Sequence, residues 1–177
     1  MDCCLPQIKD DSPMSGEEWA GASEPGDGYR QDCRSHGCAS RSVTRKTMML
    51  MLKPEHFDRM GAGQYRFCTD PECRVVYFPE SDGATFTTDD LRVRVGLKEK
   101  QDPISLCYCF GFNEADAGEE IARTGQTSIP QRIAALLKQG MCACPERNPS
   151  GACCLGEVNK AVKRLLAEHQ AASEKKF

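Results

Sequence analysis

The sequence predicts an α+β fold in which a small β-sheet module, stapled by a metal ion, is followed by a small helical module with its own metal site. Cysteine is abundant, with 12 residues in a chain of 177. In the first half, cysteine pairs flank short segments in which apolar and polar residues alternate, a pattern typical of strands. In the second half, segments with the periodicity of helices separate the cysteine clusters. Aromatic residues make up only 7% of the chain, so we expect bound metals to supply stability that a small core lacks.

The charge balance and the apolar runs exclude several classes of protein. Lysine and arginine total 23 against 26 acidic residues, a net charge of −3, which disfavours a nucleic-acid binder that relies on phosphate contacts. The longest apolar run, Met48 to Leu52, is far shorter than a membrane span, and the amino terminus shows no secretory signal. We therefore expect a cytoplasmic protein without a membrane span, whose reduced cysteines bind metal.

Residues 1–32 differ in composition from the rest of the chain. They contain eight acidic and two basic residues together with several prolines and glycines, and they leave a net +3 on residues 33–177. Such a composition predicts a disordered leader. Cys3 and Cys4 lie in this leader and are interpreted as unstructured thiols, with transient binding of a soft metal as the alternative.

Residues 33–101 are predicted to form the β-rich module. Four segments are each expected to be a strand: 64–67, 74–78, 85–87 and 91–96. Apolar and polar residues alternate over 64–67 and 91–96, whereas 74–78 is rich in β-branched and aromatic residues. A short helix is expected over 54–60, because Pro54 stands at its start and Gly61 just past its end.

Three methionines precede that helix. Met48, Met49 and Met51 are interpreted as core-facing residues, with binding of Cu(I) by their soft thioethers as the alternative.

Two cysteine pairs in this module have a zinc-ribbon-like layout. Zn²⁺ takes four ligands in a tetrahedron, and two tight loops that each present two ligands satisfy it while stapling a small sheet. The first pair is ambiguous, because His36 also follows Cys33 at ligand spacing and precedes Gly37, which can adopt the positive φ of a metal knuckle. The predicted Zn²⁺ ligands are Cys33, Cys38, Cys68 and Cys73, with His36 as the alternate to Cys38.

Residues 102–172 are predicted to form the helical module, followed by a frayed tail at 173–177. Three helices are expected, over 114–123, over 131–139 and from 155 onward. Asn113 provides a cap for the first helix, and Pro130 lies at the start of the second.

Six cysteines lie in the loops that join these helices: Cys107, Cys109, Cys142, Cys144, Cys153 and Cys154. We expect the Cys-x-Cys pair to lie in a loop, where alternate residues can both face one metal centre. A second cysteine cluster about 32 residues later suits a [2Fe–2S] cluster, which needs four thiolates around a rhomb larger than one ion. The last helix begins after Cys154, where its N–H groups favour the negative charge of such a cluster.

These motifs carry a family resemblance over roughly residues 33–170. The second half resembles the [2Fe–2S] module of the bacterioferritin-associated ferredoxin type, in the variant found in the CopZ-like copper-chaperone family, and the first half is similar to the zinc region of that family. The resemblance implies one mononuclear zinc and one [2Fe–2S] cluster. No Met-x-Cys-x-x-Cys motif occurs in the sequence, so the copper-carrying domain of the family is expected to be absent.

The six cysteines of the second half exceed the four that a cluster needs. A simple Cys-x-x-Cys spacing would require a thiol at position 145, where Pro145 stands, so the fourth ligand is expected beyond the Asn148 turn. The predicted [2Fe–2S] ligands are Cys107, Cys109, Cys144 and Cys154, with Cys142 and Cys153 as alternates.

We expect a redox protein rather than an enzyme, because no catalytic grouping is evident in the sequence. The predicted function is that of an iron–sulfur and zinc protein acting as a one-electron carrier or metal reductase partner in the handling of copper or another soft metal. The alternatives are a metal-binding chaperone or buffer that uses spare thiols, and an iron or redox sensor. The expected cofactors are a [2Fe–2S] cluster and Zn²⁺, with Cu⁺ as a further candidate. The expected partner is a copper chaperone, a copper-transporting protein or an electron donor or acceptor protein.

Overall fold

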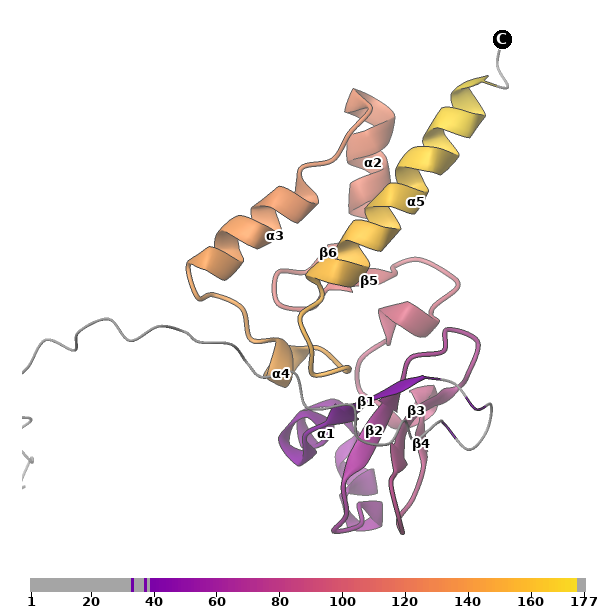
Figure 1. The fold of residues 1–177 in the computed structure, drawn as a ribbon, viewed down its shortest axis with the longest axis vertical. Coiled ribbons are helices and arrows are strands. Elements are labelled where there is room, and N and C mark those ends of the chain that lie inside the picture. Colours follow the sequence, from indigo (N-terminus) through magenta and orange to yellow (C-terminus); the bar gives the residue numbers. More distant parts are fainter. Residues whose placement is uncertain (1–32, 34–36, 38, 175–177) are drawn as a thin grey trace, which may run out of the picture.

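The computed structural model describes Cys33, Gly37 and residues 39–174, and it confirms the α+β class. A four-stranded sheet and its short helices form one end of the molecule, and a two-stranded hairpin with longer helices forms the other (Figure 1). Predictions that concern residues 1–32, His36, Cys38 and residues 175–177 lie outside the described residues.

The four strands of the larger sheet are antiparallel and follow each other in sequence order: β1 Ser40–Val43, β2 Tyr65–Cys68, β3 Val75–Pro79 and β4 Phe86–Thr87. All five residues of β3 are buried. Tyr77 belongs to the main apolar core of this end, while Val75 and Phe78 pack around the cysteines at the end of β2. Strand β3 therefore contributes side chains both to the core and to the first cysteine cluster.

Helix α1, Arg45–Met51, covers the sheet on its core side. Thr44 caps it, because its hydroxyl accepts a hydrogen bond from the Thr47 N–H at 3.0 Å. Met48 and Met51 are buried in the core, as expected, whereas Met49 is 45% exposed on the opposite side of the helix. Core packing accounts for the two buried methionines.

One local prediction in this end is confirmed and another is wrong. The short helix expected over 54–60 forms as a 3-10 helix, η1, Pro54–Arg59. The expected strand over 91–96 does not form: Leu91 makes a single bridge to Leu52, and Arg92 donates through its side chain to the Leu52 carbonyl at 2.9 Å. This segment lies against the end of α1 instead of extending the sheet. Two further 3-10 helices flank it: η2 Thr88–Asp90 and η3 Gly96–Lys98.

The other end of the molecule consists of a hairpin and four helices: β5 Ser105–Cys107, β6 Phe112–Asn113, α2 Glu114–Thr124, α3 Ile129–Lys138, α4 Cys144–Arg147 and α5 Leu155–Glu174. The predicted helices correspond to α2, α3 and α5, and α4 was not anticipated. The core of this end joins the inner face of α5 to α2, α3 and the cysteine loops. None of the helices among residues 39–174 has the length and apolarity to span a membrane.

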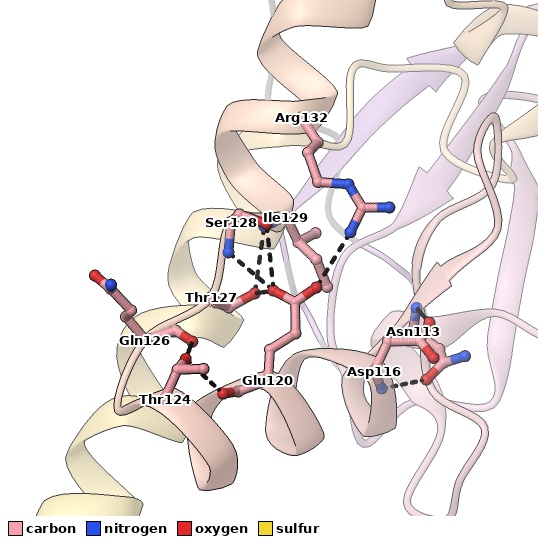
Figure 2. Close-up of polar contacts among 9 residues, drawn as sticks. All are labelled: Asn113, Asp116, Glu120, Thr124, Gln126, Thr127, Ser128, Ile129 and Arg132. Atoms are coloured by element: carbon pink, nitrogen blue, oxygen red, sulfur yellow. Dashed lines mark hydrogen bonds and ion pairs between the residues drawn. The ribbon is translucent and has the colours of Figure 1, made fainter.

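Figure 2 shows how α2 and α3 are joined. The predicted cap of α2 is confirmed, because the Asn113 side chain accepts from the Asp116 N–H at 2.9 Å. The amino end of α3 is capped by Glu120 of α2, whose Oε2 accepts from the Ser128 N–H at 2.9 Å. Arg132 of α3 completes the link with an ion pair to Glu120 at 3.1 Å.

Candidate metal centres

The first candidate centre is a cluster of three buried cysteines at the end of β2. The Sγ atoms of Cys33, Cys68 and Cys73 all lie within 4.8 Å of one another, and among the described residues no other group of three or more potential ligands is as close. A tetrahedron with Zn–S bonds of 2.3 Å has edges of about 3.8 Å, so this spacing fits three ligands of one zinc ion. The fourth predicted ligand, Cys38 or His36, lies outside the described residues.

Tight turns hold these cysteines in position. Cys68 ends β2, and the chain returns to Cys73 through a turn in which Asp70 accepts from the Glu72 N–H at 2.8 Å. On the other side, Gly37 adopts φ +61° and its N–H donates to the Cys33 carbonyl at 2.7 Å. The positive φ predicted for Gly37 is therefore confirmed.

Burial favours the protonated thiol in this cluster. Burial raises the pKa of the Cys73 thiol to about 11, a backbone N–H from Val75 partly offsets the rise, and the charges of Cys68 and Cys33 add to it. Three buried thiolates repel one another, so a bound cation is what makes the deprotonated form stable.

The second candidate centre brings together four cysteines from two distant segments. The Sγ atoms of Cys109 and Cys144 lie 3.8 Å apart, and the thiols of Cys107 and Cys154 form a hydrogen bond. The four sulfurs are therefore arranged as two close pairs. This set is more open than the cluster at the end of β2, because no three of these four sulfurs all lie within 4.8 Å of one another.

Backbone N–H groups point at three of these sulfurs. The Ala143 N–H donates to the Cys109 Sγ at 3.3 Å, and the Cys154 N–H donates to Cys144. The Cys107 thiol accepts from the N–H groups of Cys109 and Phe110. Such donors stabilise thiolate charge and are one of the means by which a protein tunes an iron–sulfur cluster.

The hydrogen bond between Cys107 and Cys154 shifts the pKa values of the two thiols in opposite directions. The hydrogen bond from Cys154 lowers the pKa of Cys107 to about 6, and the same bond raises the pKa of Cys154. Burial raises the pKa of Cys144 to about 12. One proton is thus released easily from the Cys107–Cys154 pair and the second is held strongly, as expected for two adjacent acids.

Local turns explain how the chain delivers these sulfurs. Cys107 ends β5 and Cys109 lies in the following turn, so the expected loop begins one residue after the first thiol. Cys144 is the first residue of α4, and Cys154 directly precedes α5. Between them Asn148 is buried, accepts from the Ser150 N–H at 3.0 Å and donates to the Ala152 carbonyl at 2.8 Å.

The two remaining cysteines of this half are more accessible. Cys153 is exposed and Cys142 is partly exposed. A cleft of about 900 Å³ between the sheet end and α5 is lined by both Cys153 and Cys154. Solvent and small solutes can therefore approach one side of the second centre through this cleft.

Several residues that support these centres were not predicted from the sequence. The Lys98 Nζ donates to the carbonyls of Asp70 at 2.7 Å and Cys73 at 3.0 Å, which ties the zinc-side turn to the segment that leads into the second half. Tyr108, the central residue of the Cys-x-Cys pair, accepts from the Gly96 N–H at 2.7 Å. The position of Tyr108 between two cysteines was the only sequence signal among these contacts.

Comparisons with known proteins agree with a zinc-binding part in the first half of the chain. Residues 30–92 match a CopZ-type family described as a zinc binding domain. The copper chaperone CopZ of Archaeoglobus fulgidus is 33% identical over 113 residues, covering 58% of this chain and 53% of that protein. The X-ray structure of the Archaeoglobus fulgidus CopZ N-terminal domain matches with a TM-score of 0.61 at 27% identity, covering 73% of this chain and 95% of that chain.

The chain is therefore similar to the N-terminal region of CopZ. It spans about half the length of the curated CopZ that it matches. Residues 30–92 make up less than half of the chain, whereas the match to the solved domain covers 73% of it. The likeness to the solved domain therefore extends beyond the zinc-binding part of the sequence. The zinc-binding domain and the three clustered cysteines fit Zn²⁺, and they make this a metal-binding protein.

Proposed function

We propose that Cys107, Cys109, Cys144 and Cys154 hold a [2Fe–2S] cluster, and that the protein is a one-electron carrier in copper handling. The observation that carries this proposal is the meeting of four cysteine sulfurs, from two segments far apart in the sequence, as two close pairs. The protein would act with a copper chaperone, a copper-transporting protein or an electron-donor protein as its partner.

The donor set suits a two-iron cluster better than a single ion. Each iron of a [2Fe–2S] cluster takes two cysteine thiolates, and the pairs Cys109–Cys144 and Cys107–Cys154 supply two each. A mononuclear zinc site needs all four ligands equally close. The cysteines at the end of β2 approach this spacing, and the second set does not. The N–H groups that face the sulfurs offset the negative charge of such a cluster.

Copper is the metal proposed because the curated relative is named a copper chaperone. When bound, a [2Fe–2S] cluster supplies one electron at a time, which matches the conversion of Cu(II) to Cu(I). The electron would come from a cellular one-electron donor protein. The Cys153 side of the centre opens to the cleft, where a copper ion can approach within reach of the cluster.

A second candidate function is that of a metal-binding chaperone or buffer. Its support is the exposure of Cys153 and the partial exposure of Cys142 beside the proposed cluster. Two accessible thiols suit Cu(I), a soft ion that prefers sulfur ligands.

Titration of the reduced, cluster-loaded protein with Cu(II), followed by visible absorption, distinguishes the two functions. A one-electron carrier reoxidises with about one electron transferred per copper, and a copper(I)-specific chelator recovers the reduced ion. A buffer binds copper while the cluster spectrum stays that of the reduced form.

The double variant Cys142→Ser with Cys153→Ser provides the control. The carrier function predicts that this variant still reduces copper with the same stoichiometry, because neither thiol belongs to the proposed cluster. If instead the variant fails to react with copper at all, the accessible thiols are the functional ones and the buffer function is supported.

A further inference from the structure

Both segments that present the proposed cluster cysteines are hydrogen-bonded to the sheet end, which is the end of the molecule that contains the four-stranded sheet. Tyr108 lies between Cys107 and Cys109, and its hydroxyl accepts from the Gly96 N–H at 2.7 Å and donates to the Arg94 carbonyl at 3.2 Å. Gly96 is buried and approaches Ser105 so closely that a Cβ atom there would lie 2.1 Å from the Ser105 carbonyl oxygen. The hairpin of the first two cysteines is therefore fixed to the backbone at 94–96.

The same backbone segment continues to the zinc-side turn. Lys98, two residues after Gly96, donates to the Asp70 and Cys73 carbonyls, and its Nζ also lies 5.9 Å from the centre of the Phe67 ring. A continuous set of contacts thus runs from the turn between Cys68 and Cys73 to the Cys-x-Cys hairpin.

The second cysteine segment is bonded to the sheet at a different place. Tyr77 lies on β3 and is fully buried, and its hydroxyl donates to the Pro149 carbonyl at 2.7 Å. Pro149 is itself fully buried within the turn that separates Cys144 from Cys154. A buried phenol needs a hydrogen-bond partner, and here the partner is the carbonyl of the turn that sets the spacing of two proposed ligands.

Thr47 of α1 makes a second bond to this segment. Its side chain is buried, and its hydroxyl donates to the Pro145 carbonyl at 2.7 Å, one residue after Cys144. The sheet end therefore contacts the segment directly beside Cys144 and again before Cys154.

We infer that Tyr77 and Tyr108 are positioning residues for the proposed cluster, each fixing one of the two segments that supply its cysteines to the zinc-bearing sheet. The inference rests on the proposed [2Fe–2S] site and adds that the sheet end acts as the scaffold of that site. In each pair of sulfurs, one comes from the segment held by Tyr108 and the other from the segment held by Tyr77. Loosening either segment alone changes the geometry of both pairs.

Three tyrosine-to-phenylalanine variants of the full chain test this inference. Tyr77→Phe and Tyr108→Phe each remove one hydroxyl that bonds a cysteine segment, while Tyr65→Phe removes a hydroxyl that accepts from the Gly61 N–H at 3.1 Å within the sheet end. Each protein is loaded anaerobically with iron and sulfide. The measurements are zinc content, the visible circular dichroism of the cluster and the rate of iron release to a chelator.

We expect Tyr77→Phe and Tyr108→Phe to keep their zinc, to show altered visible circular dichroism and to release iron about tenfold faster than wild type, as loss of one buried hydrogen bond predicts. Tyr65→Phe should match wild type in spectrum and rate. The inference is overturned if the three variants behave alike. Should wild type take up no cluster, the proposed function and the inference both fail, which is a different result from a stable cluster that is insensitive to these hydroxyls.

A second pair of variants decides the matter if Tyr77→Phe does not fold. Thr47→Val removes the hydroxyl that bonds Pro145, and Thr47→Ser retains it. Faster iron release in the valine variant, with the serine variant near wild type, supports the inference. Equal rates in the two variants overturn it for this segment.

Discussion

The sulfur atoms of Cys109 and Cys144 lie 3.8 Å apart although 35 positions separate the two residues in the sequence. The neighbouring thiols of Cys107 and Cys154 are joined by a hydrogen bond and are still further apart in the chain. Each pair combines one residue of the hairpin with one residue from the region of α4 and α5. Neither segment holds a pair alone, so a metal group here cross-links the two.

The first prediction concerns metal content. Protein purified without oxygen should contain about two iron atoms and about one zinc per chain, because one site offers two pairs of thiolates and the other a tetrahedral set. Elemental analysis together with acid-labile sulfide provides the measurement. Two zinc ions and no iron, reproduced after anaerobic reconstitution with iron and sulfide, would contradict the cluster assignment.

The second prediction distinguishes the cluster ligands from the spare thiols. Cys144→Ser and Cys154→Ser should abolish or strongly deplete the cluster, because a hydroxyl is a poor, rarely ionised substitute for a thiolate. Cys142→Ser and Cys153→Ser are the matched controls, each adjacent or nearly adjacent to its counterpart, and should retain iron and the visible spectrum.

Two other outcomes of this series are informative. Loss of the cluster in the Cys142 and Cys153 variants alone would show that the ligand set is wrong. A shifted but intact cluster in every single variant would show that spare thiols replace missing ligands, a behaviour that favours a redox sensor over a simple electron carrier.

The sequence predicted helix α2, whose two ends depend on residues close to them in the chain. Asn113 caps α2 as expected, and Gly125 ends it with a positive φ. A side-chain cap and a residue with positive φ both act within a few residues of where they stand. Ser128 does not cap α3 with its side chain, because Glu120 from another helix takes that role. A cap supplied across a loop leaves no local signature in the sequence.

Tertiary contacts account for the parts that the sequence did not reveal. The alternation of apolar and basic residues over 91–96 is typical of a strand. The segment does not join the sheet, because Arg92 is hydrogen-bonded to the end of α1 instead. The support that Tyr77 gives to Pro149 links positions 72 residues apart, and no spacing rule connects them. Cysteine spacing was informative because metal ligands must converge, whereas hydrogen bonds between distant segments carry no comparable pattern.

The third prediction concerns the zinc-side cluster. Cys73→Ser should remove zinc and lower the melting temperature, because a small sheet depends on the metal for part of its folding free energy. Zinc content and thermal unfolding, measured on the same preparation, provide the test. Unchanged zinc binding in Cys73→Ser would exclude this residue as a ligand, whatever its position beside Cys33 and Cys68.

The fourth zinc ligand is decided by a matched comparison. His36→Ala and Cys38→Ser change the two candidates one at a time, while both proteins keep Cys33, Cys68 and Cys73. Only the variant that lacks the true ligand should lose zinc on dialysis against a chelator, because three protein ligands hold the ion less tightly than four. Retention of zinc by both variants would mean that either residue can serve.

The last prediction concerns pH and the joint between α2 and α3. The hydrogen bond from the Thr127 hydroxyl, the Ser128 N–H and the charge of Arg132 together lower the pKa of Glu120, against the opposing effect of its partial burial. A lowered pKa in the folded protein means that the ionised carboxylate stabilises the fold. This contribution is complete above the ordinary glutamate pKa of about 4.3 and disappears as the pH falls through the lowered folded value.

Glu120→Gln should therefore lower the free energy of unfolding by about 1 kcal/mol at neutral pH, and the difference from wild type should shrink below about pH 4. Glu119→Gln is the control, because it removes a neighbouring exposed carboxylate from the same helix and reports pH effects common to the whole chain, loss of metal included. Denaturant unfolding at several pH values provides the measurement. If Glu120→Gln and Glu119→Gln lose the same stability at neutral pH, then the carboxylate that caps α3 contributes no more than a surface charge, and the contacts of Glu120 with Ser128 and Arg132 do not hold the two helices together.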